Sequence, residues 1–391
     1  MNLEKPPGGK GLGAIGKRPF AVWIGILIPL KSPLDVIHIA ARIPEMDFVM
    51  LGWPYDKSIA DRLMAEKPHN VYYLGSVSDA LKKELIQKCS AGLTTSRYEG
   101  FGWTPFEFLT AGKPVLGYPL KVFKEIYGDL MIYADDVAGL ITCLRELHGN
   151  KFKADINGVA IRDLKTRYDF SRAARKMVRT FRPESVFIFT PDVPIESDNI
   201  TGFHLVNWRL WKSIKDEGID LHILSSGWKF SRTHELAHWT SFVTGPLISF
   251  RMRLDTLEQT TTSLARLKKK LLNLTLLLLE PLCYVYFYIR QRKKAVSSVF
   301  VIATGTSQIF AAIVLKFLLR LKVACLIHDA RFCTHITEWE SFLMRCYYLF
   351  FTYCLRYVDH IMVVSKAVLE ECLPLYPHHD RLMVIWDEST I

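Results

Sequence analysis

The feature that most constrains this chain is the alternation of short apolar runs with helical patterns, which occurs twice along its length. In the first half, β-branched and aromatic residues form strand candidates at 20–27, 47–51, 70–74, 91–95, 114–116 and 130–133. Helical patterns separate them at 33–42, 57–66, 78–89, 104–111, 121–127 and 136–148. Strands that alternate with helices in this way pair in parallel, with helices on both faces of the sheet, so this half predicts an α/β domain.

The second half repeats the alternation. Helices at 152–164 and 170–181 close the first half, and Arg182-Pro183 follows, where proline disfavours helix in the residue before it. Strand candidates then lie at 186–190, 219–224, 298–303, 322–327 and 360–364, and helix candidates at 202–217, 255–292, 306–320, 338–356 and 365–373. The fold class predicted is therefore α/β with two Rossmann-like domains, residues 1–182 and 183–391.

Charge and cysteine usage limit the partners and the compartment. The formal net charge of +11 favours anionic partners, but the chain carries no nucleic-acid-binding motif, and we expect no nucleic-acid partner. None of the eight cysteines forms a C-x-x-C pair, and most lie in apolar runs. Buried thiols in a reducing compartment are the simplest interpretation, which predicts a cytoplasmic protein.

Two apolar segments raise the question of a membrane. The run 20–30 contains Pro29 near its end, is followed by Lys31 and Pro33, and lacks a small-residue cleavage site, so a buried strand is preferred to a signal sequence. The run 271–289 is almost long enough to span a bilayer, but Glu280 and Pro281 interrupt it. Three interpretations stay open for it: a buried helix, a helix on an anionic membrane surface reached through 266–294, and a spanning helix.

The most informative segment is 96–119, which follows a strand and opens a helix. In it, Thr104 is predicted to cap the helix, with Pro105 at its first position and Glu107 three residues after the cap. Gly100 and Gly102 let the backbone approach a ligand closely. A helix N-terminus with exposed N–H groups, at the carboxyl end of a parallel strand, is typical of a phosphate-binding site.

This segment resembles the signature of retaining glycosyltransferases of the group 1 (family 4) type, which have the GT-B fold. Glu99 and Glu107 have the spacing of that signature, and the run 111–115 matches its end. The resemblance implies that Glu99 holds hydroxyls of a donor sugar and that Glu107 holds the ribose of a nucleotide. It also implies that the backbone around Phe101, with Gly100, Gly102, Trp103 and Thr104, contacts the sugar or its diphosphate.

The resemblance extends to other parts of the chain. Lys31 matches a lysine that grips the diphosphate in the family, whereas Ile26 stands where the family has an arginine. In the second half, Thr201 and Gly202 resemble the first loop of the acceptor domain, where the family usually has two adjacent glycines. His328 resembles a histidine that approaches the donor sugar, although a core histidine is the competing interpretation.

The resemblance implies a transferase that moves a sugar from a nucleoside-diphosphate sugar to a glycan or lipid acceptor with retention of configuration. We expect no cofactor and no metal, since the chain has no Asp-x-Asp triplet. The donor-type half precedes the acceptor-type half, the reverse of the family order. A permuted enzyme, pieces of two tandem transferases, and a homodimer or partner transferase that completes the cleft all fit this order. An inactive or half-assembled sugar-nucleotide-binding protein is the main alternative function, and an epimerase or phosphorolytic enzyme is another.

Overall fold

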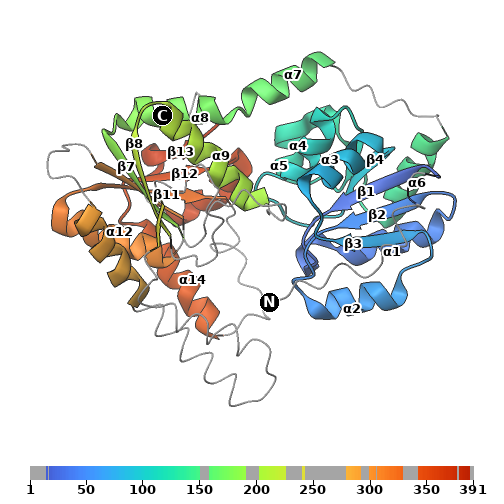
Figure 1. Ribbon diagram of the computed structural model, residues 1–391, viewed down its shortest axis with the longest axis horizontal. Coiled ribbons are helices and arrows are strands. Elements are labelled where there is room, and N and C mark those ends of the chain that lie inside the picture. The colour runs from blue at the N-terminus through green and yellow to red at the C-terminus, as the bar shows by residue number, and fades with distance from the viewer. Residues whose placement is uncertain are drawn as a thin grey trace. The chain divides into compact units, whose positions relative to one another are not determined.

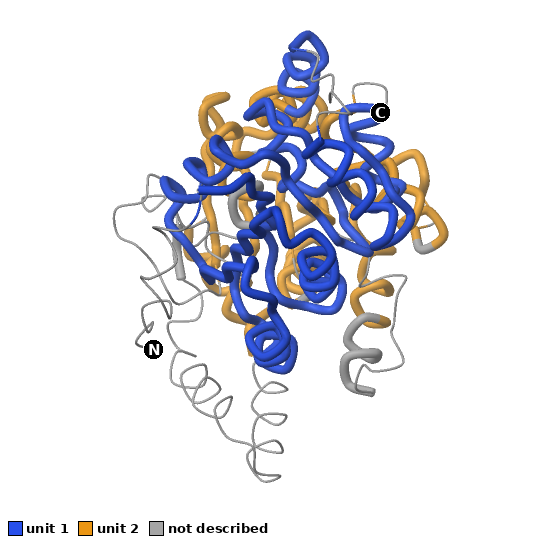
Figure 2. The backbone as a smooth tube through the Cα atoms, turned by 90° about the vertical axis from the view of Figure 1, so that its right-hand side faces the viewer, with its two compact units in different colours: residues 1–168 blue, residues 169–391 orange. Residues whose placement is uncertain are grey.

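The computed structural model describes residues 15, 17–149, 158–190, 202–225, 240–242, 279–291, 299–304, 306–328, 342–376 and 378–387 (Figure 1). They form two compact units, residues 1–168 and 169–391 (Figure 2). The predicted boundary after Arg182 therefore lies within the second unit, because helix α8 (Phe170–Phe181) belongs to that unit and packs against α9 (Gly202–Asp216).

The first unit is built on a six-stranded parallel sheet in the order β3-β2-β1-β4-β5-β6. Its strands are β1 (Phe20–Ile24), β2 (Asp47–Leu51), β3 (Val71–Gly75), β4 (Ala91–Thr94), β5 (Val115–Gly117) and β6 (Ile132–Tyr133). Its helices are α1 (Pro33–Arg42), α2 (Lys57–Glu66), α3 (Asp79–Lys88), α4 (Trp103–Thr110), α5 (Lys121–Tyr127), α6 (Val137–His148) and α7 (Gly158–Arg167). The order reverses between β1 and β4, which in a sheet of this type is where ligands bind.

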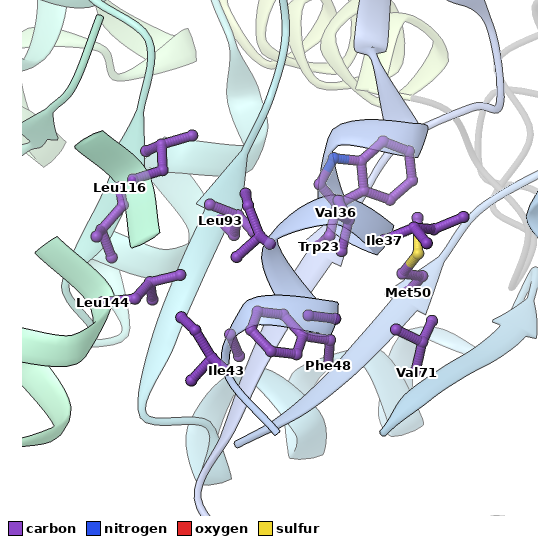
Figure 3. Close-up of a cluster of buried hydrophobic side chains, with 14 of the residues drawn as sticks. Trp23, Val36, Ile37, Ile43, Phe48, Met50, Val71, Leu93, Leu116 and Leu144 are labelled. Atoms are coloured by element: carbon purple, nitrogen blue, oxygen red, sulfur yellow. The ribbon is translucent and has the colours of Figure 1, made fainter. Parts of the chain in front are cut away.

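Helices cover both faces of this sheet, as its apolar strands require. On one face, α1, α2 and α6 pack over a core that includes Trp23, Phe48 and Leu93 (Figure 3). On the other face, α4 packs on β4, where Phe108 lies over Gly92. Because Gly92 has no side chain, the ring reaches the strand and holds α4 close to the sheet.

The second unit is built on a seven-stranded parallel sheet in the order β13-β12-β11-β10-β7-β8-β9. Its strands are β7 (Ser185–Thr190), β8 (Asp220–Ser225), β9 (Thr240–Phe242), β10 (Val299–Ala303), β11 (Lys322–Ile327), β12 (His360–Val363) and β13 (Leu382–Val384). Besides α8 and α9, its helices are α12 (Thr306–Leu319), α14 (Phe342–Leu355), α15 (Lys366–Cys372) and a helix at 279–291. The order reverses between β7 and β10, as it does between β1 and β4 in the first unit.

The two faces of this second sheet carry different helices. Tyr288, in the helix at 279–291, packs edge-on against Phe187 of β7. Phe181 of α8 stacks on Phe300 of β10. Phe187 pairs with Val301, the residue after Phe300, so the two phenylalanines point to opposite faces of the sheet. The helices α8 and 279–291 therefore lie on opposite sides of the sheet.

The predicted α/β class with two Rossmann-like domains is confirmed. Strands β9 and β13, of three residues each, were not predicted. The predicted helix at 255–292 lies in the described part of the chain only at 279–291. Among the described residues, no helix combines the length and apolar character needed to cross a bilayer.

We expect Gly92→Ala to destabilise the first unit by about 1–3 kcal/mol, because the added Cβ would lie 2.5 Å from ring carbons of Phe108. The measurement is urea unfolding followed by tryptophan fluorescence. Gly158→Ala is the matched control, since a Cβ there meets only Arg162 at 3.9 Å. Equal stability of the two variants would contradict the described packing of α4 on β4.

Candidate functional site

The candidate site lies at the carboxyl edge of the first sheet, where the loop after β1 meets the loop after β4. These two strands are hydrogen-bonded neighbours, so their loops leave the sheet side by side. The Arg97 amide donates to the Leu30 carbonyl at 2.8 Å. The Thr95 hydroxyl lies 2.7 Å from the Lys31 carbonyl oxygen and 3.0 Å from that of Ser32. These contacts fix the two loops against each other, and with them the side chains that they carry.

Lys31 and Glu99, which are far apart in the sequence, form an ion pair at this edge. The Lys31 ammonium contacts Oε1 of Glu99, and both side chains are mostly buried. The Ser96 hydroxyl donates to the same oxygen at 2.7 Å. Two donors on one oxygen hold the carboxylate in a defined orientation.

Glu107 lies on α4 and is held by a second lysine. Lys82 of α3 lies 3.0 Å from Oε1 of Glu107 and 3.4 Å from Oδ1 of Asp79. Burial lowers the pKa of Lys82, but the two carboxylates outweigh this effect, and the pKa of Lys82 is raised above its ordinary value. Lys82 is therefore a charged partner of Glu107, which sequence analysis missed because the contact depends on how α3 packs beside α4.

Helix α4 begins at Trp103, and its cap is Gly102, two residues before the predicted cap Thr104. Gly102 has φ +80°, a left-handed conformation, and makes no side-chain cap. Its carbonyl accepts a hydrogen bond from the Tyr127 hydroxyl at 2.5 Å. The predicted capping box is wrong: Pro105 lies in the first turn rather than at its first position, and Glu107 faces Lys82 instead of the helix start.

The glycines and aromatic residues before α4 shape this turn. A Cβ on Gly102 would lie 2.3 Å from Phe123, so only glycine fits there. Phe101 is buried and stacks on Trp103 with 4.1 Å between ring centroids. Tyr168 meets the edge of Phe101 at 5.0 Å. The Phe101 ring therefore packs in the protein interior.

A second polar cluster lies beside the ion pair and was not singled out from the sequence. Asp35, in the first turn of α1, accepts from Arg97 at 2.9 Å and from the Tyr118 hydroxyl at 2.6 Å. Burial and the Asp35 carboxylate raise the pKa of Tyr118. The Arg97 guanidinium also lies 3.9 Å from the centre of the Tyr118 ring. The signal was available, because Asp35 follows Lys31 closely and Tyr118 follows directly after β5.

Two further residues of the first unit relate to the resemblance. Ile26, which stands where an arginine was expected, lies half-buried in the loop after β1. The Thr104 hydroxyl is 3.5 Å from the carbonyl of Ile24, at the end of β1, so the first turn of α4 lies over that strand end. Lys31 is therefore the only member of the expected cation pair that this loop supplies.

The predicted residues of the second half belong to the second unit. Thr201 lies outside the described residues, and Gly202 begins α9. His328 directly follows β11, and its Nε2 lies 2.7 Å from Oδ1 of the buried Asn207. Burial lowers the pKa of His328 to about 3, so the ring is neutral near pH 7 and donates from Nε2 to Asn207.

Comparison with known proteins gives one match to a family. Residues 10–135 match the model of the family described as glycosyl transferases group 1. This range contains Lys31, Lys82, Glu99 and Glu107, the residues that form the two ion pairs of the site. Among curated proteins, none matches the chain.

Similar solved structures resemble only part of the chain. TarM from S. aureus, solved with fondaparinux, alpha-GlcNAc-glycerol and UDP, is 17% identical, with a TM-score of 0.33, over 39% of this chain and 33% of TarM. HepE from Anabaena, solved with UDP and glucose, is 17% identical, with a TM-score of 0.38, over 44% of this chain and 50% of HepE. The catalytic domain of a cholesterol-alpha-glucosyltransferase from Helicobacter pylori is 13% identical, with a TM-score of 0.31, over 38% of this chain and 98% of that domain. The chain thus spans half or less of the length of TarM and HepE.

We expect His328 to make the second unit sensitive to acid. Its pKa in the folded protein, about 3, is below its ordinary value of 6.5, so the unfolded chain binds the proton more tightly. Its contribution to stability is therefore complete above pH 6.5 and falls by about 1.4 kcal/mol per pH unit below it, down to the folded pKa.

The measurement is urea unfolding at about pH 7 and about pH 5. His328→Gln keeps an N–H donor for Asn207 but removes the titration, so its stability should depend less on pH in this window. A wild-type protein and a variant that lose the same stability between the two pH values would show that His328 is not the titrating group.

Proposed function

We propose that the protein transfers a sugar from a nucleoside-diphosphate sugar to a glycan or lipid acceptor, because residues 10–135 match the model of the group 1 glycosyl transferases. The observation that carries this proposal is the placement of Lys31 and Glu99 in contact at the point where the first sheet reverses its strand order. A lysine and a carboxylate at that edge supply a charge for a diphosphate and acceptors for sugar hydroxyls.

Each residue of the site has a task in this proposal. Lys31 and the N–H groups at the start of α4 stabilise the negative charge that develops on the leaving diphosphate. Glu99 accepts hydrogen bonds from hydroxyls of the donor sugar, and Glu107 accepts from the ribose hydroxyls. The transfer retains configuration, requires no metal, and uses the donor phosphate to assist deprotonation of the acceptor.

A second candidate function follows from Ile26. The family resemblance implies an arginine at this position, and isoleucine cannot pair with a diphosphate. The candidate is a protein that binds a sugar nucleotide without transferring the sugar. Consumption of a bound donor in the presence of an acceptor mixture distinguishes the transferase from this binding protein.

We expect Lys31→Ala and Glu107→Ala each to weaken the binding of UDP or GDP by about ten- to a hundredfold, since each removes a charged hydrogen-bond partner of the ligand. The measurement is isothermal titration calorimetry, followed by the same titration with the corresponding nucleotide sugars.

Lys88→Ala and Glu84→Ala are the matched controls, because these residues form an exposed ion pair on α3 with 2.6 Å between Nζ and Oε1. They should bind as the wild-type protein does. If folded wild-type protein binds neither nucleotide, or if the control variants weaken binding as much as the site variants, the proposed donor site is wrong.

We expect Lys82 to position Glu107 for the ribose, so that Lys82→Met weakens nucleotide binding about tenfold and Lys82→Arg restores part of the loss. A purely structural role would lower the unfolding midpoint together with the affinity, so thermal unfolding is measured in parallel. Tighter binding by Lys82→Met would mean instead that Lys82 blocks Glu107 in the empty site.

A further inference from the structure

The second unit exposes an unusual share of the apolar surface of this protein. Of the fifteen large hydrophobic side chains that are exposed among the described residues, eleven lie between residues 279 and 357. They are Leu279, Leu282, Tyr286, Ile289, Phe310, Phe317, Leu318, Leu349, Phe350, Tyr353 and Tyr357, which we call the apolar surface. Large exposed apolar patches of this kind mark sites at which a protein binds another protein, a membrane or a ligand.

On each helix the exposed residues form one stripe. In the helix at 279–291, Leu282, Tyr286 and Ile289 have helical spacing, while Tyr284 and Tyr288 face the sheet and are fully buried. On α12 the stripe includes Phe317, which is 67% exposed, and on α14 it includes Leu349, which is 61% exposed. Each helix therefore packs one face against the core and exposes a second face that is also apolar.

The stripes of α12 and α14 join into one surface. These helices pack side by side (Figure 1). The ring centroids of Phe310 and Phe350 are 5.5 Å apart, and those of Phe317 and Tyr357 are 6.1 Å apart. Lys316 of α12 also donates to the Tyr357 carbonyl at 2.8 Å, which ties the last turn of α12 to the end of α14. The apolar surface is thus held by contacts within the described fold.

Among the described residues of these helices the exposed charges are positive, because the acidic neighbours Glu280 and Asp359 are buried and Asp359 pairs with Lys316. From residue 281 to 328, and again from 341 to 358, the sequence contains no aspartate or glutamate. Arginine and lysine do occur there, and Arg290, Arg320 and Arg356 are exposed. Arg320 and Arg356 directly follow α12 and α14, whose ends are joined by the Lys316 contact. A partner of this surface therefore has apolar groups next to negative charge.

From these observations we infer that the outer faces of α12, α14 and the helix at 279–291 bind the surface of an anionic lipid membrane. Aromatic and aliphatic side chains enter the acyl boundary, and the arginines contact lipid phosphates. The inferred contact is with one leaflet. Sequence analysis left a contact of this kind open for 266–294 alone, and the present inference adds α12 and α14 to it.

The test is co-sedimentation of the full chain with vesicles of phosphatidylcholine, with and without phosphatidylglycerol, in the absence of donor and acceptor. We expect binding to the anionic vesicles that falls about tenfold or more in the double variant Phe317→Ser with Leu349→Ser. The double variant Tyr55→Ser with Met64→Ser is the matched control, because it removes two exposed apolar side chains of the first unit and should bind as the wild type does.

Charge is tested separately with Arg320→Gln combined with Arg356→Gln, which should weaken binding to anionic vesicles and make it less sensitive to salt. Sedimentation velocity without lipid shows whether the surface instead joins two copies of the chain. The inference is overturned if the wild type binds no vesicles, if the Phe317 and Leu349 double variant binds like the control, or if that variant converts a dimer to a monomer. None of these outcomes depends on glycosyl transfer.

Discussion

The parallel pairing of β1 with β4 is the contact on which the candidate site depends. Ala21 pairs with Ala91 and Trp23 with Leu93, so the two strands end at the same edge of the sheet. The intervening strands β2 and β3 lie on the far side of β1, which brings the loop of Lys31 next to the loop of Glu99. The ion pair, the Thr95 contacts and the position of the start of α4 all follow from this arrangement. Without it, these residues would not lie close together.

Local pattern was enough to predict most elements of the fold. Helices α1, α2, α5 and α8 have the predicted bounds, because apolar periodicity and flanking turn residues are properties of short segments. The three-residue strands β9 and β13 are too short to show a period of their own, and only their pairing with β8 and β12 defines them. The start of α4 was misplaced because Thr104 has a good capping side chain, whereas the glycine before it adopts the positive φ that the turn requires.

The side chains of the site were predicted from spacing and resemblance, but their partners were not. The contact between Lys82 and Glu107 depends on the packing of α3 beside α4. No sequence pattern within either helix predicts this contact. The same holds for Asp35, whose partners come from the ends of β4 and β5. His328 is paired with Asn207, and each sheet is built entirely from strands of its own unit.

In the proposed reaction, the ion pairs that Lys31 and Lys82 form at the candidate site have a consequence for product release. Lys31 pairs with Glu99, and Lys82 pairs with Glu107 and Asp79. In the proposed reaction, Lys31 pairs with the diphosphate, so Glu99 loses a hydrogen-bond donor. The hydroxyls of the sugar then donate to Glu99 instead. Binding is then an exchange of counter-ions rather than an addition of charge. Once the sugar has left, Glu99 competes with the nucleoside diphosphate for Lys31. This competition favours release of the nucleoside diphosphate.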